Sequence, residues 1–446
     1  MERLFEPRAV AVVGASRDPR KVGHSVLRNL LAGFEGDVYP VNPHADEILG
    51  VRCYPSLSEV PGPVDLAVIV VPAPIVPEVV REAGEAGVGY CVVISAGFSE
   101  AGNEELEREL VRAAREAGVR IVGPNCLGVI NARSGLNASF AAEMPPAGSI
   151  AFVSQSGALA TSVIDWFSSG DVGAIGVGFS KFVSLGNAAD LDFPDFLEYL
   201  AGDEETDVVV LYLEGVKDGD AFAEALSACA GRKPVIVLKG GRTEAGAEAV
   251  STHTGSLAGS GEVYRGVIEQ CGGVFVEGFE EAFDTAKLLA KAGPPRSDRV
   301  LVVTNAGGGG ILAADALHEA GFRLPEPEGD PSVLPEEAAT GNPVDVLGDA
   351  DAERYRVALE EFADPDRYGA VIVILTPQSV TEPVRTARVV AEFAEEFPGP
   401  VLGVWMGRHS VAVGVRTLEE SGVPTFPSPE RAVRALRNAA LWAKII

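Results

Sequence analysis

The sequence has little cysteine, no long uninterrupted apolar run and few positive charges, and each shortage excludes a class of protein. The five cysteines are widely spaced and form no C-x-x-C pair, so we expect neither a disulfide framework nor a metal site. The longest apolar run, residues 66–80, is broken by three prolines, so it cannot cross a bilayer, and nothing at the N-terminus has the pattern of a secretory leader. Lys and Arg total 36 against 64 for Asp and Glu, which argues against binding to nucleic-acid backbones. We therefore expect a cytoplasmic protein without membrane or nucleic-acid partners.

The length of 446 residues is enough for about three domains. Two Pro/Gly-rich stretches, at 145–148 and 291–295, are typical of linkers and divide the chain into residues 1–145, 146–293 and 294–446. Short β-branched runs alternate with stretches of helical period, which predicts an α/β fold with doubly wound parallel sheets. The strands expected in the first third are Ala9–Val13, Asp37–Pro40, Leu66–Val71, Tyr90–Ile94 and Arg120–Val122.

The second and third segments look like copies of one another. Each opens as strand, Gly-rich or Ser-rich turn and helix, which predicts two flavodoxin-like units with ligands at the carboxyl ends of the strands. In the second copy Thr376 replaces Glu214 and Glu419 replaces His253, so we expect chemistry in the first copy and only scaffolding in the second. The paired stretches are 150–160 with 300–310, 186–187 with 341–342, 208–214 with 370–376, and 234–242 with 400–408.

The first strand-to-helix turn could present backbone N–H groups to a phosphate. NAD is disfavoured because G-x-G-x-x-G is absent and the second strand ends in Val41-Asn42-Pro43 without the acid that binds a ribose. The turn is either a site for another phosphorylated ligand or a plain tight connection. Residues at the tips of neighbouring strands would line the same edge. The candidates are Gly14, Ala15, Ser16, Arg17, Lys21, Asn42, Val71, Pro72, Ala73, Ser95, Ala96, Gly97 and Asn125.

A second Ser-rich turn, formed by Ser154, Gln155, Ser156 and Gly157, follows a strand and precedes a helix. Free N–H groups, hydroxyls and the helix dipole suit a phosphate, although either serine could equally be a plain N-cap. The nucleophile-elbow pattern G-x-S-x-G is missing, so neither serine is expected to be a hydrolase nucleophile.

His253 lies among hydroxyls and glycines in the segment 251–261. An imidazole can act as a neutral nucleophile near pH 7 when a partner fixes its tautomer. Glu214 ends an apolar strand on the same side of the sheet as the Ser154 turn and could be that partner. A histidine in an ordinary polar loop and a solvated acid at a strand end are the alternatives.

Taken together, these motifs resemble the α subunit of ADP-forming acetyl-CoA synthetases, in the NDP-forming acyl-CoA synthetase superfamily. The resemblance covers essentially the whole chain. It rests on the Val12–Arg17 turn, Val41-Asn42-Pro43, Ser154–Gly157, Ser184–Asn187, Glu214 and His253–Gly259.

The resemblance implies a Rossmann-like CoA-binding domain in 1–145, a ligase domain carrying a phosphorylated His253 in 146–293, and a second ligase domain in 294–446. Phosphate would attack an acyl-CoA thioester, with acetyl-CoA as the default. His253, held by Glu214, would then take the phosphoryl group from the acyl phosphate and pass it to ADP. The first-domain candidates would bind CoA, and the Ser154–Gly157 turn would bind phosphate.

The sequence contains no P-loop and no ATP-grasp region. The resemblance therefore implies that ADP or ATP with Mg²⁺ binds a separate ATP-grasp β subunit, in an α2β2 assembly. His44 stands where family members often carry Lys, which affects one expected contact to CoA. Succinyl-CoA synthetase α subunits lack the third segment. A CoA-binding regulatory module without turnover is the alternative function, although it would need neither Glu214 nor the His253 segment.

Overall fold

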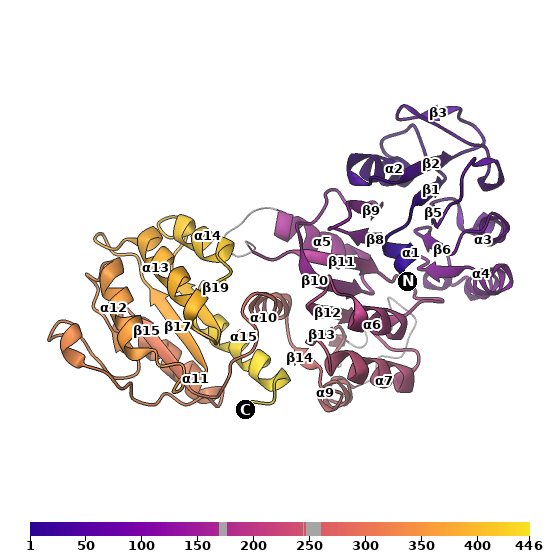
Figure 1. The fold of residues 1–446 in the computed structure, drawn as a ribbon. Coiled ribbons are helices and arrows are strands. Elements are labelled where there is room, and N and C mark those ends of the chain that lie inside the picture. The colour runs from indigo at the N-terminus through magenta and orange to yellow at the C-terminus, as the bar shows by residue number, and fades with distance from the viewer. Residues whose placement is uncertain (169–175, 244, 247–259) are drawn as a thin grey trace. The chain divides into compact units, whose positions relative to one another are not determined.

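The computed structural model describes residues 1–168, 176–243, 245–246 and 260–446 (Figure 1). The chain forms two compact units. The first contains residues 1–168 and 178–275, and the second contains residues 276–446 together with Gly176 and Val177. Within the described residues no helix is both long and apolar enough to cross a membrane.

The first sheet of unit 1 is parallel, in the order β2-β1-β5-β6-β7. All five strands fall where the sequence predicts them. Their apolar, β-branched side chains lie on both faces of the strands, which is the pattern of a parallel sheet covered on two sides. Helix α4 ends at Gly118, whose left-handed φ of 70° stops it. The strands are β1 Ala9–Val13, β2 Asp37–Val41, β5 Leu66–Ile69, β6 Tyr90–Val93 and β7 Arg120–Val122, with a small ribbon of β3 Glu47–Ile48 and β4 Val51–Arg52. The helices are α1 Glu2–Phe5, α2 Val22–Gly33, α3 Val76–Glu85 and α4 Glu104–Ala117, with 3₁₀ turns at Leu57–Glu59, Ala73–Ile75 and Ser99–Ala101.

The second sheet of unit 1 has seven strands, in the order β14-β13-β12-β10-β11-β8-β9. Its last two strands form a hairpin from the segment before residue 145, and β8 pairs antiparallel with β11. The first segment therefore supplies part of the sheet of the first ligase copy. The strands are β8 Gly128–Asn131, β9 Leu136–Ser139, β10 Ala147–Ser154, β11 Phe179–Ser184, β12 Val208–Leu213, β13 Val235–Lys239 and β14 Val274–Val276. The helices are α5 Gly157–Ser168, α6 Phe193–Gly202, α7 Gly219–Ala230 and α9 Gly261–Gln270.

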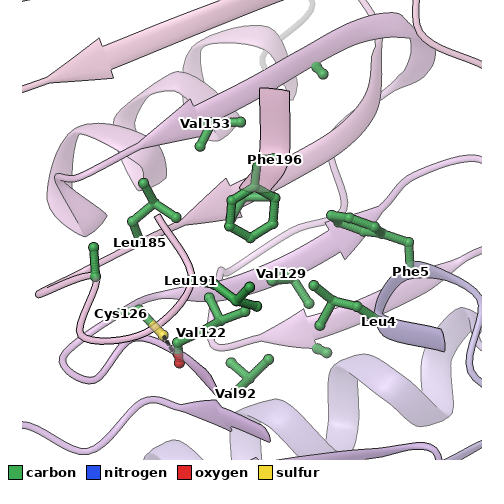
Figure 2. Close-up of a cluster of buried hydrophobic side chains, with 14 of the residues drawn as sticks. Leu4, Phe5, Val92, Val122, Cys126, Val129, Val153, Leu185, Leu191 and Phe196 are labelled. Atoms are coloured by element: carbon green, nitrogen blue, oxygen red, sulfur yellow. Dashed lines mark hydrogen bonds between the residues drawn. The ribbon is translucent and has the colours of Figure 1, made fainter. Parts of the chain in front are cut away.

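One hydrophobic core runs through both sheets of unit 1. Figure 2 shows Val92 and Val122 of the first sheet in the same cluster as Val129 of β8 and Phe196 of α6. Phe5 of α1 stands edge-on to Phe196, with ring centroids 6.3 Å apart. The two sheets are therefore held together by shared packing.

The sheet of unit 2 is parallel, in the order β16-β15-β17-β18-β19. This order matches β11-β10-β12-β13-β14 of unit 1, so the internal repeat is confirmed at the level of topology. Helix α10 precedes the linker at 291–295 but belongs to unit 2. The strands are β15 Val300–Thr304, β16 Val344–Asp345, β17 Ala370–Leu375, β18 Val401–Trp405 and β19 Thr425–Phe426. The helices are α10 Phe279–Lys291, α11 Gly307–Glu319, α12 Ala352–Phe362, α13 Pro383–Glu396, α14 Ala412–Glu420 and α15 Pro429–Trp442, with a 3₁₀ turn at Pro331–Val333.

Two details of the sequence pairing between the copies are wrong. Gly186-Asn187 follows β11, whereas Gly341-Asn342 precedes the equivalent strand β16, so the two dipeptides are not equivalent. Glu419 lies in the last turn of α14, which matches α9, so its counterpart is Glu269 rather than His253. The apparent equivalence of His253 and Glu419 arose because the connection after β13, residues 240–260, is longer than residues 406–411 after β18.

Candidate functional site

The turn after β1 brings several candidate CoA-binding residues to one edge of the first sheet. Gly14 has a φ of +94°, and a Cβ on Gly23 would lie only 2.1 Å from the Gly14 carbonyl oxygen, so helix α2 packs directly on the turn. The Asn42 side chain donates to the Ala15 carbonyl oxygen at 2.7 Å, which ties the ends of β1 and β2 together. Arg17 is exposed and donates from Nε to the Glu47 carbonyl oxygen at 2.9 Å. Gly14, Gly23 and Asn42 thus shape the turn at the start of α2, and this turn is called the cradle below.

The tips of β5 and β6 continue this edge. Ser95 donates from Oγ to the Val71 carbonyl oxygen at 2.5 Å, and a Cβ on Gly97 would lie 3.3 Å from the Ala73 Cβ. The Asn125 N–H donates to the Ser95 carbonyl oxygen at 3.0 Å. Pro72 and Ala96 lie between these residues in the chain. The structure therefore gathers the predicted residues from β5, β6 and β7.

Glu100, which the sequence reading did not single out, occupies part of this edge. Its Oε1 accepts hydrogen bonds from the N–H groups of Gly97 at 2.5 Å and Phe98 at 3.2 Å. Burial acts to raise the pKa of Glu100, but the hydrogen bonds from Asn187 and from the Gly97 and Phe98 amides leave that pKa below its ordinary value. The Gly97 N–H, at one of the predicted CoA contacts, is therefore already hydrogen bonded to a carboxylate.

Asn187 connects this edge to the edge of the second sheet. Its Nδ2 donates to Glu100 Oε2 at 2.6 Å and its Oδ1 accepts from Asn125 Nδ2 at 3.2 Å. Asn187 follows β11, which lies next to β10 with Ser184 opposite Ser154. The predicted CoA edge and the predicted phosphate turn therefore meet within one unit.

The turn Ser154–Gly157 is built from its own serines. Ser154 is buried, its Oγ donates to the Ser156 carbonyl oxygen at 2.9 Å, and the Ser156 N–H donates back to Ser154 Oγ at 3.1 Å. Ser156 Oγ accepts from the Leu159 N–H at 3.4 Å, which is a helix N-cap at the start of α5. Both hydroxyls thus hold the turn in shape, and a phosphate at this place would be met by the helix start.

Gln155 braces the turn that carries Glu214. Its Oε1 accepts from the Glu214 N–H at 2.5 Å and the Gly215 N–H at 3.1 Å, and its Nε2 donates to the Gly215 carbonyl oxygen at 2.9 Å. The half-buried Glu214 therefore stands at the end of β12, beside the start of α5. Gln155 fixes the end of β12 relative to the Ser154 turn.

Sequence reasoning missed the residues around Glu214. The Tyr212 hydroxyl is hydrogen bonded to the Glu214 carboxylate; burial first, and then this negative charge, raise the pKa of Tyr212 to about 12. Lys239, at the end of β13, is only 2% exposed and donates from Nζ to the Glu214 carbonyl oxygen at 2.8 Å and to the Gly240 carbonyl oxygen. The sequence signal that could have found Lys239 is a lysine at the end of an otherwise apolar strand.

His253 lies outside the described residues, as do the other residues of 247–259. The described residues that flank this segment lie together, since a Cβ on Gly261 would be 2.4 Å from the Arg242 carbonyl oxygen. The two flanks therefore lie at one place, beyond the end of β13. Among the described residues there is no group of three His, Cys, Asp or Glu side chains that could hold a metal ion.

Three family models match successive parts of the chain. Residues 8–132 match the model of the CoA binding domain, residues 147–289 that of the succinyl-CoA ligase like flavodoxin domain, and residues 300–445 that of the ligase-CoA domain. The chain is 40% identical, over its whole length, to subunit alpha of the ADP-forming acetate–CoA ligase II of Pyrococcus furiosus, of which it covers 98%. It belongs to the family of ADP-forming acetate–CoA ligases.

Other members of the ADP-forming acetate–CoA ligase family agree with this assignment. The chain is 46% identical to the ADP-forming acetate–CoA ligase I of Archaeoglobus fulgidus and spans 64% of the length of that enzyme. A solved structure of the dinucleotide-forming acetyl-coenzyme A synthetase 1 of Ca. Korarchaeum cryptofilum, in complex with phosphate and ADP, superposes with a TM-score of 0.94. It is 40% identical, and the match covers 100% of this chain and 97% of that one.

The predicted fold class, a Rossmann-like CoA-binding domain followed by two succinyl-CoA synthetase-like units, is confirmed for this member of the ADP-forming acetate–CoA ligase family. The relatives are named as enzymes, which favours a ligase over a regulatory module without turnover.

Proposed function

We propose that this chain is the α subunit of an ADP-forming acyl-CoA synthetase that interconverts acyl-CoA, ADP and phosphate with free acid, CoA and ATP. Acetyl-CoA is the default substrate, because its relatives are named acetate–CoA ligases. The observation that carries the proposal is the meeting of two sheet edges at Asn187, one with the CoA cradle and one with the Ser154 turn and Glu214. A thioester bound at the first edge would then lie on the side of the unit that carries a phosphate bound at the second.

The reaction has three steps. Phosphate attacks the thioester carbonyl, the C–S bond breaks, and CoA leaves with an acyl phosphate formed. The imidazole of His253 attacks the phosphorus and releases the carboxylate of the acid. ADP then takes the phosphoryl group from His253, giving ATP and a free imidazole.

The described residues fit the first two steps. The start of α5 presents backbone N–H groups and the positive end of its dipole, which stabilise a phosphoryl group as charge develops on it. Glu214 would accept a hydrogen bond from the imidazole nitrogen that does not carry the phosphoryl group, fixing the tautomer of His253. Arg17 and Lys21 are exposed at the cradle and would bind the phosphates of CoA.

We assign the third step to a partner. ADP or ATP with Mg²⁺ would bind an ATP-grasp β subunit in an α2β2 assembly, which we place in the cytoplasm.

The test is label transfer to the chain, copurified with its nucleotide-binding partner. With acetyl-CoA and ³²P-phosphate, the wild-type chain should acquire an acid-labile, base-stable label, and the His253→Asn variant should acquire none and lose turnover. The control is His318→Asn, since His318 is exposed on α11. Full turnover and labelling of the His253→Asn complex would contradict the phosphohistidine mechanism.

A further inference from the structure

Lys239 is a buried cation at the edge where Glu214 stands. Besides the carbonyl oxygens of Glu214 and Gly240, its ammonium faces the ring of Tyr264, 4.8 Å from the ring centroid. The Tyr264 hydroxyl in turn accepts a hydrogen bond from the Val216 N–H at 3.2 Å. One lysine and one tyrosine thus hold the turns after β12 and β13 from the inside.

In the second copy, the position equivalent to Lys239 holds an uncharged side chain. Lys239 pairs with Leu213 of β12, and Trp405 pairs with Leu375 of β17, so Trp405 occupies the position of Lys239. Trp405 is 1% exposed and donates from Nε1 to the Pro383 carbonyl oxygen at 3.2 Å.

The residue facing this position has changed as well. Helices α9 and α14 each end just before a glycine with positive φ, Gly272 at +83° and Gly422 at +84°, and this match makes Gly414 the counterpart of Tyr264. A Cβ on Gly414 would lie 2.9 Å from Trp405 Nε1, so the indole fills the room that the tyrosine ring takes in the first copy. The same fold therefore accommodates either pair at these two positions: lysine with tyrosine in the first copy, and tryptophan with glycine in the second.

Burying the lysine of the first copy costs more free energy of folding than burying the tryptophan of the second. Taking an ammonium out of water is unfavourable unless its protons are met, and burial lowers the pKa of Lys239, although the negative charge of Glu214 acts in the opposite direction. Because the second copy shows that the fold can form around an apolar side chain here, the charge needs an explanation other than packing. Glu214 differs at the same edge, because the second copy has Thr376 in its place, and it is the group whose main chain Lys239 contacts.

We infer that Lys239 is a positioning residue for phosphoryl transfer: by tying the turn after β12 to the turn after β13, its ammonium holds Glu214 in place at the end of β12, beside the start of α5. This inference rests on the proposed function. Lys239 acts through the main chain of Glu214 and Gly240, so it shapes the site without touching the substrate.

The experiment measures phosphoenzyme formation and unfolding on the chain with its partner. Lys239→Met keeps an unbranched side chain, one atom shorter, and removes the charge. At saturating acetyl-CoA and phosphate, its rate of ³²P uptake should fall about 10- to 100-fold, the cost of a misplaced catalytic group. The KM for acetyl-CoA should stay within about twofold, because the CoA cradle lies on another sheet.

A second variant guards against a loss of folding. Lys239→Trp combined with Tyr264→Gly installs the residues of the second copy, and it should unfold near the wild-type temperature while still forming phosphoenzyme slowly. The matched control is Lys287→Met in unit 2. Lys287 is also buried and donates to a backbone carbonyl oxygen, that of Thr425, with the ring centroid of Phe426 5.0 Å away. This control should lower the unfolding temperature and leave the uptake rate of the folded complex unchanged.

The outcomes are separable. If the double variant is folded and takes up label at the wild-type rate, Lys239 has no positioning role and the inference is overturned, while loss of label in His253→Asn would still support the function. If His253→Asn keeps its label, the proposed function itself fails. An equal slowing in Lys287→Met would assign the effect to stability alone and would also overturn the inference.

Discussion

The sheet β10–β14 and the sheet β15–β19 have the same strand order and close their first turns with the same hydrogen bonds. Thr304 Oγ1 accepts from the Ala306 N–H at 3.1 Å, as Ser154 Oγ does from the Ser156 N–H. Asn305 Oδ1 accepts from the Thr376 N–H at 2.8 Å, as Gln155 Oε1 does from the Glu214 N–H at 2.5 Å.

The difference between the copies lies in what these shared turns carry. The first copy has Glu214, Tyr212 and Lys239 where the second has Thr376, Ile374 and Trp405. The turn geometry is therefore a requirement of the fold, and the ionisable groups are additions to it. Four changes test this separation.

Exchanging the residues that end β12 and β17 should have the largest effect. Glu214→Thr removes the carboxylate proposed to orient His253, and we expect ³²P uptake to fall by about 10²- to 10⁴-fold, the usual contribution of a positioned acid or base. Thr376→Glu is the reverse exchange and should leave uptake unchanged. Equal effects of the two exchanges on uptake would erase the distinction between the copies.

Truncating the braces should affect stability in both copies and rate in only one. Gln155→Ala and Asn305→Ala each leave backbone groups of a strand-end turn without their partner, so each should lower the free energy of unfolding by about 1–3 kcal/mol in chemical denaturation. Only Gln155→Ala should also slow phosphoenzyme formation, by about tenfold, because it loosens the turn of Glu214. A slowing of similar size in Asn305→Ala would show that the second copy takes part in that step.

Adding one carbon at Gly240 should have a smaller effect. A Cβ there would lie 2.6 Å from the Tyr212 hydroxyl oxygen, so Gly240→Ala should push the tyrosine away from Glu214 and reduce kcat a few-fold. The combination with Tyr212→Phe removes the clashing hydroxyl and should restore part of the loss. The second copy carries Met406 at this place and Ile374 in the position of Tyr212, so Met406→Ala should leave kcat unchanged. Failure of the double variant to recover would show that the clash is not the cause.

The smallest effect concerns alkaline pH. The pKa of Tyr212 is raised to about 12 from an ordinary 10.0, so the folded chain holds this proton more tightly than the unfolded chain. The resulting stability is fully present below pH 10 and is lost as the pH rises through 12. Tyr212→Phe should therefore flatten the fall of the unfolding midpoint between pH 10 and 12, measured in urea, relative to wild type. An unchanged slope would contradict the shift.

The sequence predicted the strands and their doubly wound order well, because parallel strands buried on both faces appear as continuous apolar runs such as Ala9–Val13. The positions of the Ser154 turn and of Glu214 at strand ends were equally readable, because they follow directly from where the strands end. Lys239 and Glu100 were not, because their roles depend on contacts with residues 25 positions away, at Glu214, and 87 positions away, at Asn187. The pairing of Glu419 with His253 failed because a constant offset cannot account for a longer connection.

The hairpin β8–β9 has a consequence for how the chain is made. Strand β8 pairs with β11, whose residues 179–184 leave the ribosome only after those of the whole first sheet. Until then one long edge of the hairpin and its apolar residues, among them Val129 and Ile130, have no partner. The hairpin can therefore complete its pairing only once β11 has been made. A gene fusion or truncation made at residue 145 would separate two strands that pair, and its product would be prone to aggregate.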